Sequence, residues 1–171
     1  MKRSKKIIIS ILLVMSLLLL FLIWYNVEYS MHKVKAYQVN SPELPKKLLI
    51  ATQGSAFKDS LTQKIISHYK RDPLFIKVID ISNLAEINPE NYNALVLIHT
   101  WENYKPPTDV KNFIERTTAY KDRIIVFTSS GQGNFKMDEV DALTGESKLE
   151  NVDYFTNKII KRVNPLFTET N

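Results

Sequence analysis

The sequence predicts a three-layer α/β sandwich with a four- to five-stranded parallel sheet, preceded by one membrane-spanning helix. Four short runs rich in Ile, Val and Leu alternate with stretches whose apolar residues repeat at helical spacing. This alternation is typical of a parallel sheet with right-handed crossover connections. A separate apolar run of 18 residues lies near the start of the 171-residue chain, and that length matches the thickness of a bilayer.

The first 45 residues are predicted to form a basic tail (1–6), an apolar helix (7–24) and a spacer (25–45). The helix would be roughly 27 Å long, close to the hydrocarbon thickness of a membrane. The alternative is a cleaved signal peptide, but signal peptides have a shorter apolar core and end in a small-residue cleavage site. No such site follows Trp24, so we favour an uncleaved anchor.

The charges around the apolar run predict its orientation. Four basic residues precede it: Lys2, Arg3, Lys5 and Lys6. Because positive charge is retained on the cytoplasmic side, we expect a single-pass protein of the bacterial cell membrane, with its N-terminus cytoplasmic and its domain extracytoplasmic. These four residues account for most of the formal net charge of +5. The charge is therefore a topology signal and gives no support for nucleic-acid binding.

One domain is predicted over residues 46–167, followed by a tail over 168–171. Its predicted strands are Lys47–Thr52, Phe75–Ile81, Ala94–His99 and Arg123–Thr128. Three of these runs are continuously apolar, as buried parallel strands are, whereas Lys77 and Asp80 interrupt the second and predict an edge strand. The predicted strand order is 2-1-3-4, with a short fifth strand expected over Glu139–Leu143.

Helices are predicted between and after these strands. Apolar residues stand four apart from Phe57 to Tyr69, and a second stripe extends from Val110 to Thr117. The clearest stripe, from Val152 to Val163, predicts the last helix. The link Pro89–Tyr92 is too short for more than a turn or a short helix.

Ligands of open parallel sheets bind outside the carboxyl ends of the strands, where three polar loops (52–56, 99–104 and 128–134) are expected to meet. In the first loop, Gly54 permits close backbone approach, and the following helix offers N–H groups to an anion; alternatively, Ser55 only caps that helix. In the second loop, Trp101 and Tyr104 would stack on a planar ligand or cover the sheet edge. Together the loops predict a pocket for a planar, phosphate-bearing ligand.

Residues 46–163 resemble the flavodoxin-like family in the order of their elements and the positions of these loops. The first loop of flavodoxins, Ser/Thr-x-Thr-Gly-x-Thr, wraps the phosphate of FMN, and here Ala51-Thr52-Gln53-Gly54-Ser55-Ala56 has its glycine at the family position. The loop after the third strand often places an aromatic ring against the flavin, as Trp101 would. The resemblance implies an FMN site formed by Thr52, Gly54, Ser55, Thr100, Trp101, Tyr104, Ser129, Ser130, Gly131 and Gly133.

A second resemblance concerns the segment 141–147, Asp-Ala-Leu-Thr-Gly-Glu-Ser. It looks like the motif on which flavin transferases attach FMN covalently in exported bacterial proteins, and this likeness implies Ser147 as the acceptor. In the alternative interpretation, Asp141, Thr144 and Ser147 are turn and capping residues that lead into the last helix.

The sequence offers few residues for metal binding or nucleophilic catalysis. The chain has three histidines and no cysteine, so no metal site is predicted, and it contains no Walker loop or nucleophile elbow. Only His99 reaches the predicted site, where a structural role is the more common one. The leading hypothesis is an FMN-binding redox or electron-transfer module. The alternative is a flavodoxin-like domain that has lost flavin binding and acts as an interaction or accessory module; a hydrolase ranks third for want of a nucleophile and base.

Overall fold

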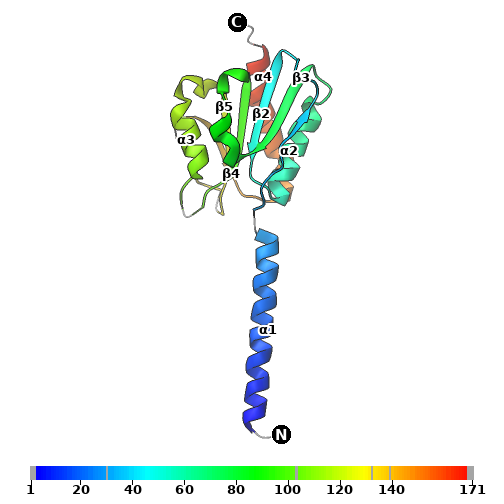
Figure 1. Cartoon of the computed structure of the whole chain (residues 1–171), viewed down its shortest axis with the longest axis vertical. Helices are drawn as coiled ribbons and strands as arrows, with labels where there is room; N and C mark the ends of the chain where they lie inside the picture. Colours follow the sequence, from blue (N-terminus) through cyan, green and yellow to red (C-terminus); the bar gives the residue numbers. More distant parts are fainter. Residues whose placement is uncertain (1–2, 30, 103, 132, 139, 169–171) are drawn as a thin grey trace. The chain divides into compact units, whose positions relative to one another are not determined.

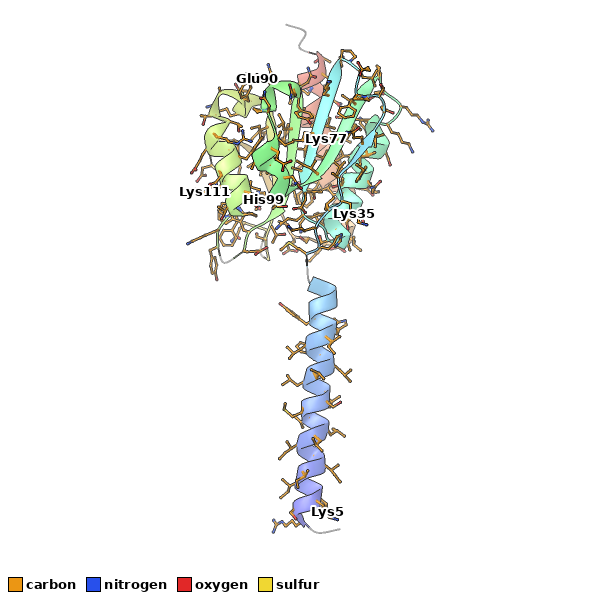
Figure 2. The ribbon with its side chains drawn as sticks, in the orientation of Figure 1. Lys5, Lys35, Lys77, Glu90, His99 and Lys111 are labelled. Carbon is orange, nitrogen blue, oxygen red and sulfur yellow. The ribbon has the colours of Figure 1, made fainter. Side chains whose placement is uncertain are left out.

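The computed structural model describes residues 3–29, 31–102, 104–131, 133–138 and 140–168, which fall into two compact units, Met1–Met31 and His32–Asn171. The described part of the first unit contains one long helix, α1 (Arg3–Tyr29). Its stretch Arg3–Tyr25 is long and apolar enough to cross a membrane. The large apolar side chains from Ile7 to Trp24 are all exposed and surround the helix axis (Figure 2).

The second unit contains a six-stranded sheet in the order β1-β3-β2-β4-β5-β6. The strands are β1 (Tyr37–Val39), β2 (Lys46–Thr52), β3 (Leu74–Asp80), β4 (Ala94–Thr100), β5 (Ile124–Ser129) and β6 (Asp141–Gly145). All neighbouring pairs from β3 to β6 are parallel, and only β1 pairs antiparallel, with β3. The predicted parallel order 2-1-3-4, with a fifth strand at the end, is therefore confirmed.

Helices cover both faces of this sheet (Figure 1). On one face, α2 (Ala56–Tyr69) and α4 (Val152–Thr168) bury the side chains of one core cluster. On the other face, α3 (Thr108–Arg116) and the 3-10 helix η1 (Ile81–Glu86) bury a second cluster. The short 3-10 helices are η2 (Pro89–Asn91), η3 (Thr118–Arg123) and η4 (Leu149–Asn151), and η2 agrees with the short link expected after the second predicted strand.

The second predicted strand is β3, and the prediction that it forms the sheet edge is wrong because β1 pairs with it. The Asp80 side chain of this strand is buried. Its carboxylate accepts hydrogen bonds from the backbone N–H of Val34 (2.9 Å) and of Ser82 (3.0 Å). Both β1 and Val34 come from the segment expected to be a spacer, so the unit begins at His32. The fifth strand starts later than expected, at Asp141; Glu139 lies outside the described residues.

Candidate functional site

The three polar loops do meet at the carboxyl edge of the sheet, where backbone and side-chain hydrogen bonds join them. The first loop contacts the second through Gln53, whose N–H donates to Ile98 O (3.2 Å) and whose Oε1 accepts from Thr100 N (2.7 Å). The second contacts the third through the Thr100 and Ser129 hydroxyls, 2.7 Å apart. The sequence therefore predicted correctly which loops gather at this edge.

Gly54 lies close to His32 and not to open space. Its N–H donates to His32 O (2.9 Å), and the His32 N–H donates back to Gly54 O (3.1 Å). A Cβ atom added at Gly54 would lie 2.3 Å from the His32 ring. Only glycine permits another group to approach the backbone this closely. The group that approaches Gly54 is His32 of the same chain, at the position where the family resemblance expects phosphate.

The N-terminus of α2 is capped by Ser55, as the simpler interpretation expected. The Ser55 Oγ accepts from Lys58 N (3.3 Å) and also lies 3.2 Å from the Lys58 Nζ. Only 2% of Lys58 is exposed, and this burial lowers its pKa to about 8 although Asp59 and Glu102 oppose the shift. Lys58 thus lies buried at the first turn of α2, with the carboxylates of Asp59 and Glu102 near enough to favour its charged form. Thr52, at the end of β2, donates its hydroxyl to Gln53 O (3.0 Å).

His99 ends the buried part of β4 (Figure 2) and is fully enclosed. Its Nε2 lies 3.3 Å from the Thr128 hydroxyl, and its Nδ1 has no partner among the described residues. Burial lowers the pKa of His99 to about 4, so the imidazole is neutral at physiological pH. This agrees with a structural role, and no group of three or more His, Asp or Glu that could hold a metal occurs in the described part of the chain.

The aromatic side chains of the second and third loops stack on each other. The Trp101 ring lies 5.1 Å from that of Phe135 with an interplanar angle of 13°, and Tyr104 contacts the edge of the same phenyl ring (5.5 Å). Tyr104 is 81% exposed and has a positive φ of 60°. A planar ligand could stack between Trp101 and Phe135 only if the two rings were roughly 7 Å apart. At 5.1 Å the rings stack on each other and leave no room for a ligand between them.

Two backbone N–H groups of the third loop donate to acceptors within the chain. Ser130 N donates to Gly145 O (3.2 Å), and Gly133, at a φ of 63°, donates to Ser130 O (3.1 Å). A Cβ added at Gly131 would meet nothing within 4 Å. The Ser130 Oγ of this loop is buried without a partner among the described residues, as are the Trp101 Nε1 and the His99 Nδ1 of the second loop. Each such group costs about 1–3 kcal/mol unless something binds it.

The expected covalent acceptor, Ser147, is exposed and lies just after β6. The capping alternative is wrong for Asp141 and Thr144, because both belong to β6. The Asp141 carboxylate accepts from Arg162 Nε on α4 (2.9 Å). The residue that precedes η4 is Lys148, and it makes no side-chain cap.

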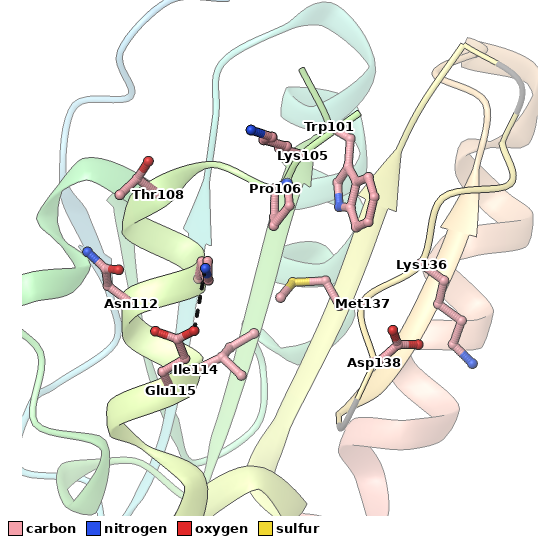
Figure 3. A pocket seen from close by; sticks show the side chains of 11 residues that line it. Trp101, Lys105, Pro106, Thr108, Asn112, Ile114, Glu115, Lys136, Met137 and Asp138 are labelled. Atoms are coloured by element: carbon pink, nitrogen blue, oxygen red, sulfur yellow. Dashed lines mark ion pairs between the residues drawn. The ribbon is translucent and has the colours of Figure 1, made fainter. Parts of the chain in front are cut away.

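A groove of about 600 Å³ lies beside these loops, on the α3 face of the sheet (Figure 3). Trp101 lines it from the second loop, Pro106 from the chain just before α3, Ile114 from α3, and Met137 from the chain before β6. Lysines contribute to its rim, and one of them, Lys111, pairs with Glu115 (3.7 Å). No residue of the first loop is part of its lining.

The residues at the carboxyl edge do not fit FMN as the flavodoxin resemblance implies. The Gly54 N–H and the space against Gly54 are taken by His32, and one face of the Trp101 ring is covered by Phe135. The N–H groups of Gln53, Thr100 and Ser130 also donate to acceptors within the chain. These four backbone donors, those of Gln53, Gly54, Thr100 and Ser130, are therefore already used within the chain.

Three residues that shape this edge were missed in the sequence: His32, Lys58 and Phe135. His32 lies in a polar stretch far from Gly54 in the sequence, and its pairing is made by backbone atoms that carry no residue signature. Lys58 occupies a polar position of the predicted helix, where lysine is normally exposed. Phe135 stands alone among polar residues, although an isolated aromatic residue two positions after a Gly-x-Gly turn is a usable signal for a ring packed against a neighbouring loop.

Five parallel strands in the order β3-β2-β4-β5-β6, with helices on both faces, define a flavodoxin-like fold. No protein-family model and no curated protein sequence matches the chain. Among solved structures, the chain is similar to a flavodoxin from the domain Archaea, at 12% sequence identity and a TM-score of 0.47. The alignment covers 70% of this chain and 98% of that one.

Proposed function

We propose that this chain is a single-pass membrane protein whose flavodoxin-like domain works without FMN, as an interaction or accessory module. The observation that carries this proposal is the paired hydrogen bonding between His32 and Gly54. It occupies the one backbone position of the first loop that the chain shares with the flavodoxin phosphate loop. An anion there would have to displace two backbone hydrogen bonds and the His32 ring.

The aromatic loops support the same conclusion. Trp101 and Phe135 are in direct contact, so a flavin ring would have to separate them before it could stack between the two rings. Both obstacles would have to be removed at once, because FMN binds through its phosphate and its ring together. The energy for these two rearrangements would be subtracted from the binding energy.

The FMN-binding redox module is the second candidate, and one observation favours it. The Ser130 Oγ and Trp101 Nε1 are buried donors without an acceptor among the described residues, and both belong to loops that contact flavin in the family. Ligand atoms would satisfy them.

The anchor and its orientation are part of the proposal. Arg3, Lys5 and Lys6 stand at the start of α1, and positive charge at that end favours a cytoplasmic N-terminus, in a bacterial cell membrane with the domain outside. Because the chain has no cysteine, single cysteines test this directly. Ser147→Cys should react with a membrane-impermeant maleimide in intact cells, and Lys5→Cys should react only after lysis; the reverse pattern would refute the orientation, and release of the domain into the medium would identify a cleaved signal.

Titration of FMN with the purified full chain in detergent micelles separates the two functions. We expect no quenching of FMN fluorescence at protein concentrations of about 100 μM, which corresponds to binding weaker than about −5.5 kcal/mol. Saturable quenching with a Kd near or below the micromolar range, weakened at least tenfold by Trp101→Ala, would establish the FMN module instead.

Covalent flavin is tested on the same protein. We expect acid-precipitated chain from cells that coexpress a flavin transferase to be colourless and to have its unmodified mass. A flavin that remains after precipitation and disappears in Ser147→Ala would show that Ser147 is an acceptor and would contradict the proposal.

A further inference from the structure

Ser55 and Lys58 form a hydroxyl–amine pair at the start of α2. Their spacing of three residues places both side chains on one face of the helix, and helical side chains tilt toward the N-terminus. The Lys58 Nζ lies 3.2 Å from the Ser55 Oγ, and the Lys58 backbone N–H donates to the same oxygen (3.3 Å). The hydroxyl is therefore held within proton-transfer distance of the amine.

The two side chains differ in their access to solvent. Ser55 is partly exposed, whereas only 2% of Lys58 is exposed. The next residue, Ala56, is exposed as well. A molecule in solution can therefore approach the serine at the helix start, while the amine behind it is shielded from water.

The charge of Lys58 depends on the groups around it. Asp59 on the same helix and Glu102 on the second loop favour the ammonium form, but burial outweighs them and lowers the pKa of Lys58 to about 8. His99 on β4, which interacts electrostatically with Lys58, has its own pKa lowered to about 4 and is neutral near pH 8. Near that pH a large fraction of Lys58 is a neutral amine, the form that accepts a proton from a serine hydroxyl.

The backbone beside Ser55 supplies a donor for a developing oxyanion. N–H groups in the first turn of a helix have no intrahelical acceptor, and the Ala56 N–H has no acceptor among the described residues. In hydrolases whose nucleophilic serine stands between a strand and a helix, the N–H of the following residue binds the oxyanion. Ser55 likewise stands between β2 and α2, and Ala56 follows it.

We propose that Ser55 is a nucleophile activated by Lys58 and that the pair hydrolyses carboxylic esters. The Ser55 Oγ bonds to the ester carbonyl carbon as its proton moves to the Lys58 Nζ, and the Ala56 N–H binds the carbonyl oxygen. The bond to the alcohol oxygen breaks, and Lys58 returns the proton to that oxygen. Water then cleaves the acyl-serine bond by the same route, which releases the acid and restores the hydroxyl.

This activity is additional to the accessory role proposed above and requires no FMN. It also provides the nucleophile and the base that no motif in the sequence identified. The FMN titration and the ester assay therefore fail or succeed separately, because the first measures flavin fluorescence and the second measures the chemistry of Ser55.

The test uses the full chain in detergent micelles and two probes. A fluorophore-tagged fluorophosphonate forms a P–O bond with an activated serine and releases fluoride, and we expect about one label per chain, located on Ser55 by peptide mass spectrometry. The ester p-nitrophenyl butyrate should be hydrolysed with repeated turnover. Because neutral Lys58 is the base, both rates should rise with pH through about 8 and then level off.

Three variants complete the test. Lys58→Gln removes the base and should slow both reactions at least about hundredfold. Ser55→Asn keeps a favourable helix cap but has no hydroxyl, so both reactions should disappear. Ser60→Ala, which changes another serine of α2, is the matched control and should alter neither rate.

Four results would overturn the proposal. They are an unlabelled Ser55, labelling without ester turnover, rates that Lys58→Gln or Ser55→Asn leaves unchanged, and rates of the unmodified chain that stay constant from about pH 7 to about pH 9. The last result needs no variant, so it holds even where a substitution at the buried Lys58 unfolds the domain. Each of them would leave Ser55 as a helix cap only.

Discussion

The two faces of the sheet bury similar apolar strands but are covered differently. Beneath α2 and α4, one core cluster joins both helices to all five parallel strands. On the opposite face, α3 and η1 cover the middle of the sheet, and the connection before β6 leaves the groove beside α3. Both faces of the sheet therefore bury an apolar cluster, whereas open space remains beside the connection before β6, whose described residues form no helix.

Phe127→Ala should have the largest effect, because it opens a cavity in the closed face. Phe127 is fully buried and packs against the rings of Phe57 (5.7 Å) and Phe155 (4.7 Å). Removing a buried phenyl ring costs about 3–5 kcal/mol, a large fraction of the stability of a typical domain. The loss of stability is measured by urea denaturation of the full chain, with unfolding monitored by Trp101 fluorescence in the Trp24→Phe background.

Phe127→Leu serves as the control for this cavity, since it keeps most of the apolar volume and should lose only about 1–2 kcal/mol. If Phe127→Ala lost less than about 1 kcal/mol, the α2/α4 face would not be the tightly packed side of the molecule.

Acid should be the second largest perturbation, and it acts on the α3 face through His99. Burial holds the pKa of His99 at about 4 in the folded protein, below the ordinary value near 6.5. Between these pH values the unfolded chain binds the additional proton, so stability is complete above about pH 6.5 and falls as pH drops toward 4. The full window corresponds to about 3 kcal/mol.

His99→Gln removes this titration, and its stability should be nearly constant from pH 6.5 to 4.5 in urea denaturation. Asp80 also has a lowered pKa, because backbone and side-chain hydrogen bonds from Val34 and Ser82 outweigh its burial, but its effect begins at lower pH. If the stability of His99→Gln fell with pH as steeply as that of the unmodified chain, His99 would not be the group that titrates.

The strands and their order were predictable because the signal is local and strong. Leu48, Ile50, Val96 and Phe127 belong to continuous apolar runs, and buried parallel strands require such runs. The order then follows from chain connectivity and crossover handedness. The same reasoning located the three loops at one edge.

The sequence could not reveal that other parts of the chain already fill that edge, because this depends on contacts between segments far apart in the sequence. β1 has only three residues, and it forms by pairing with β3, so it carries no pattern of its own. His32 meets Gly54 through backbone atoms, and Phe135 meets Trp101 through a loop of irregular structure. A loop motif predicts which groups are present at a site and says little about whether other parts of the chain already use them.

Gly54→Ala tests this occupied edge and should have a smaller effect than either preceding change. The added Cβ would lie 2.3 Å from the His32 ring and 2.5 Å from His32 O, so the two hydrogen bonds between these residues must lengthen or break. At about 0.5–1.5 kcal/mol each, the expected loss is about 1–2 kcal/mol by urea denaturation.

Gly131→Ala is the matched control, because a Cβ there meets nothing within 4 Å and its expected effect is below about 0.5 kcal/mol. Equal losses at the two glycines would show that the contact with His32 contributes nothing to stability.

The smallest effect is expected at the groove itself, from Met137→Ala. Met137 is only partly buried and lies at the margin of the second cluster, so truncation enlarges a space that is already open and creates no closed cavity. We expect a loss below about 1 kcal/mol, against about 2–5 kcal/mol for Leu61→Ala on the fully buried side of α2. If Met137→Ala destabilised the chain as much as Leu61→Ala, then the connection before β6 would complete the core of the α3 face, and the groove would be part of the packing that maintains the fold. A small loss would instead mean that the side chains of the groove are free to serve a ligand without a cost to the fold.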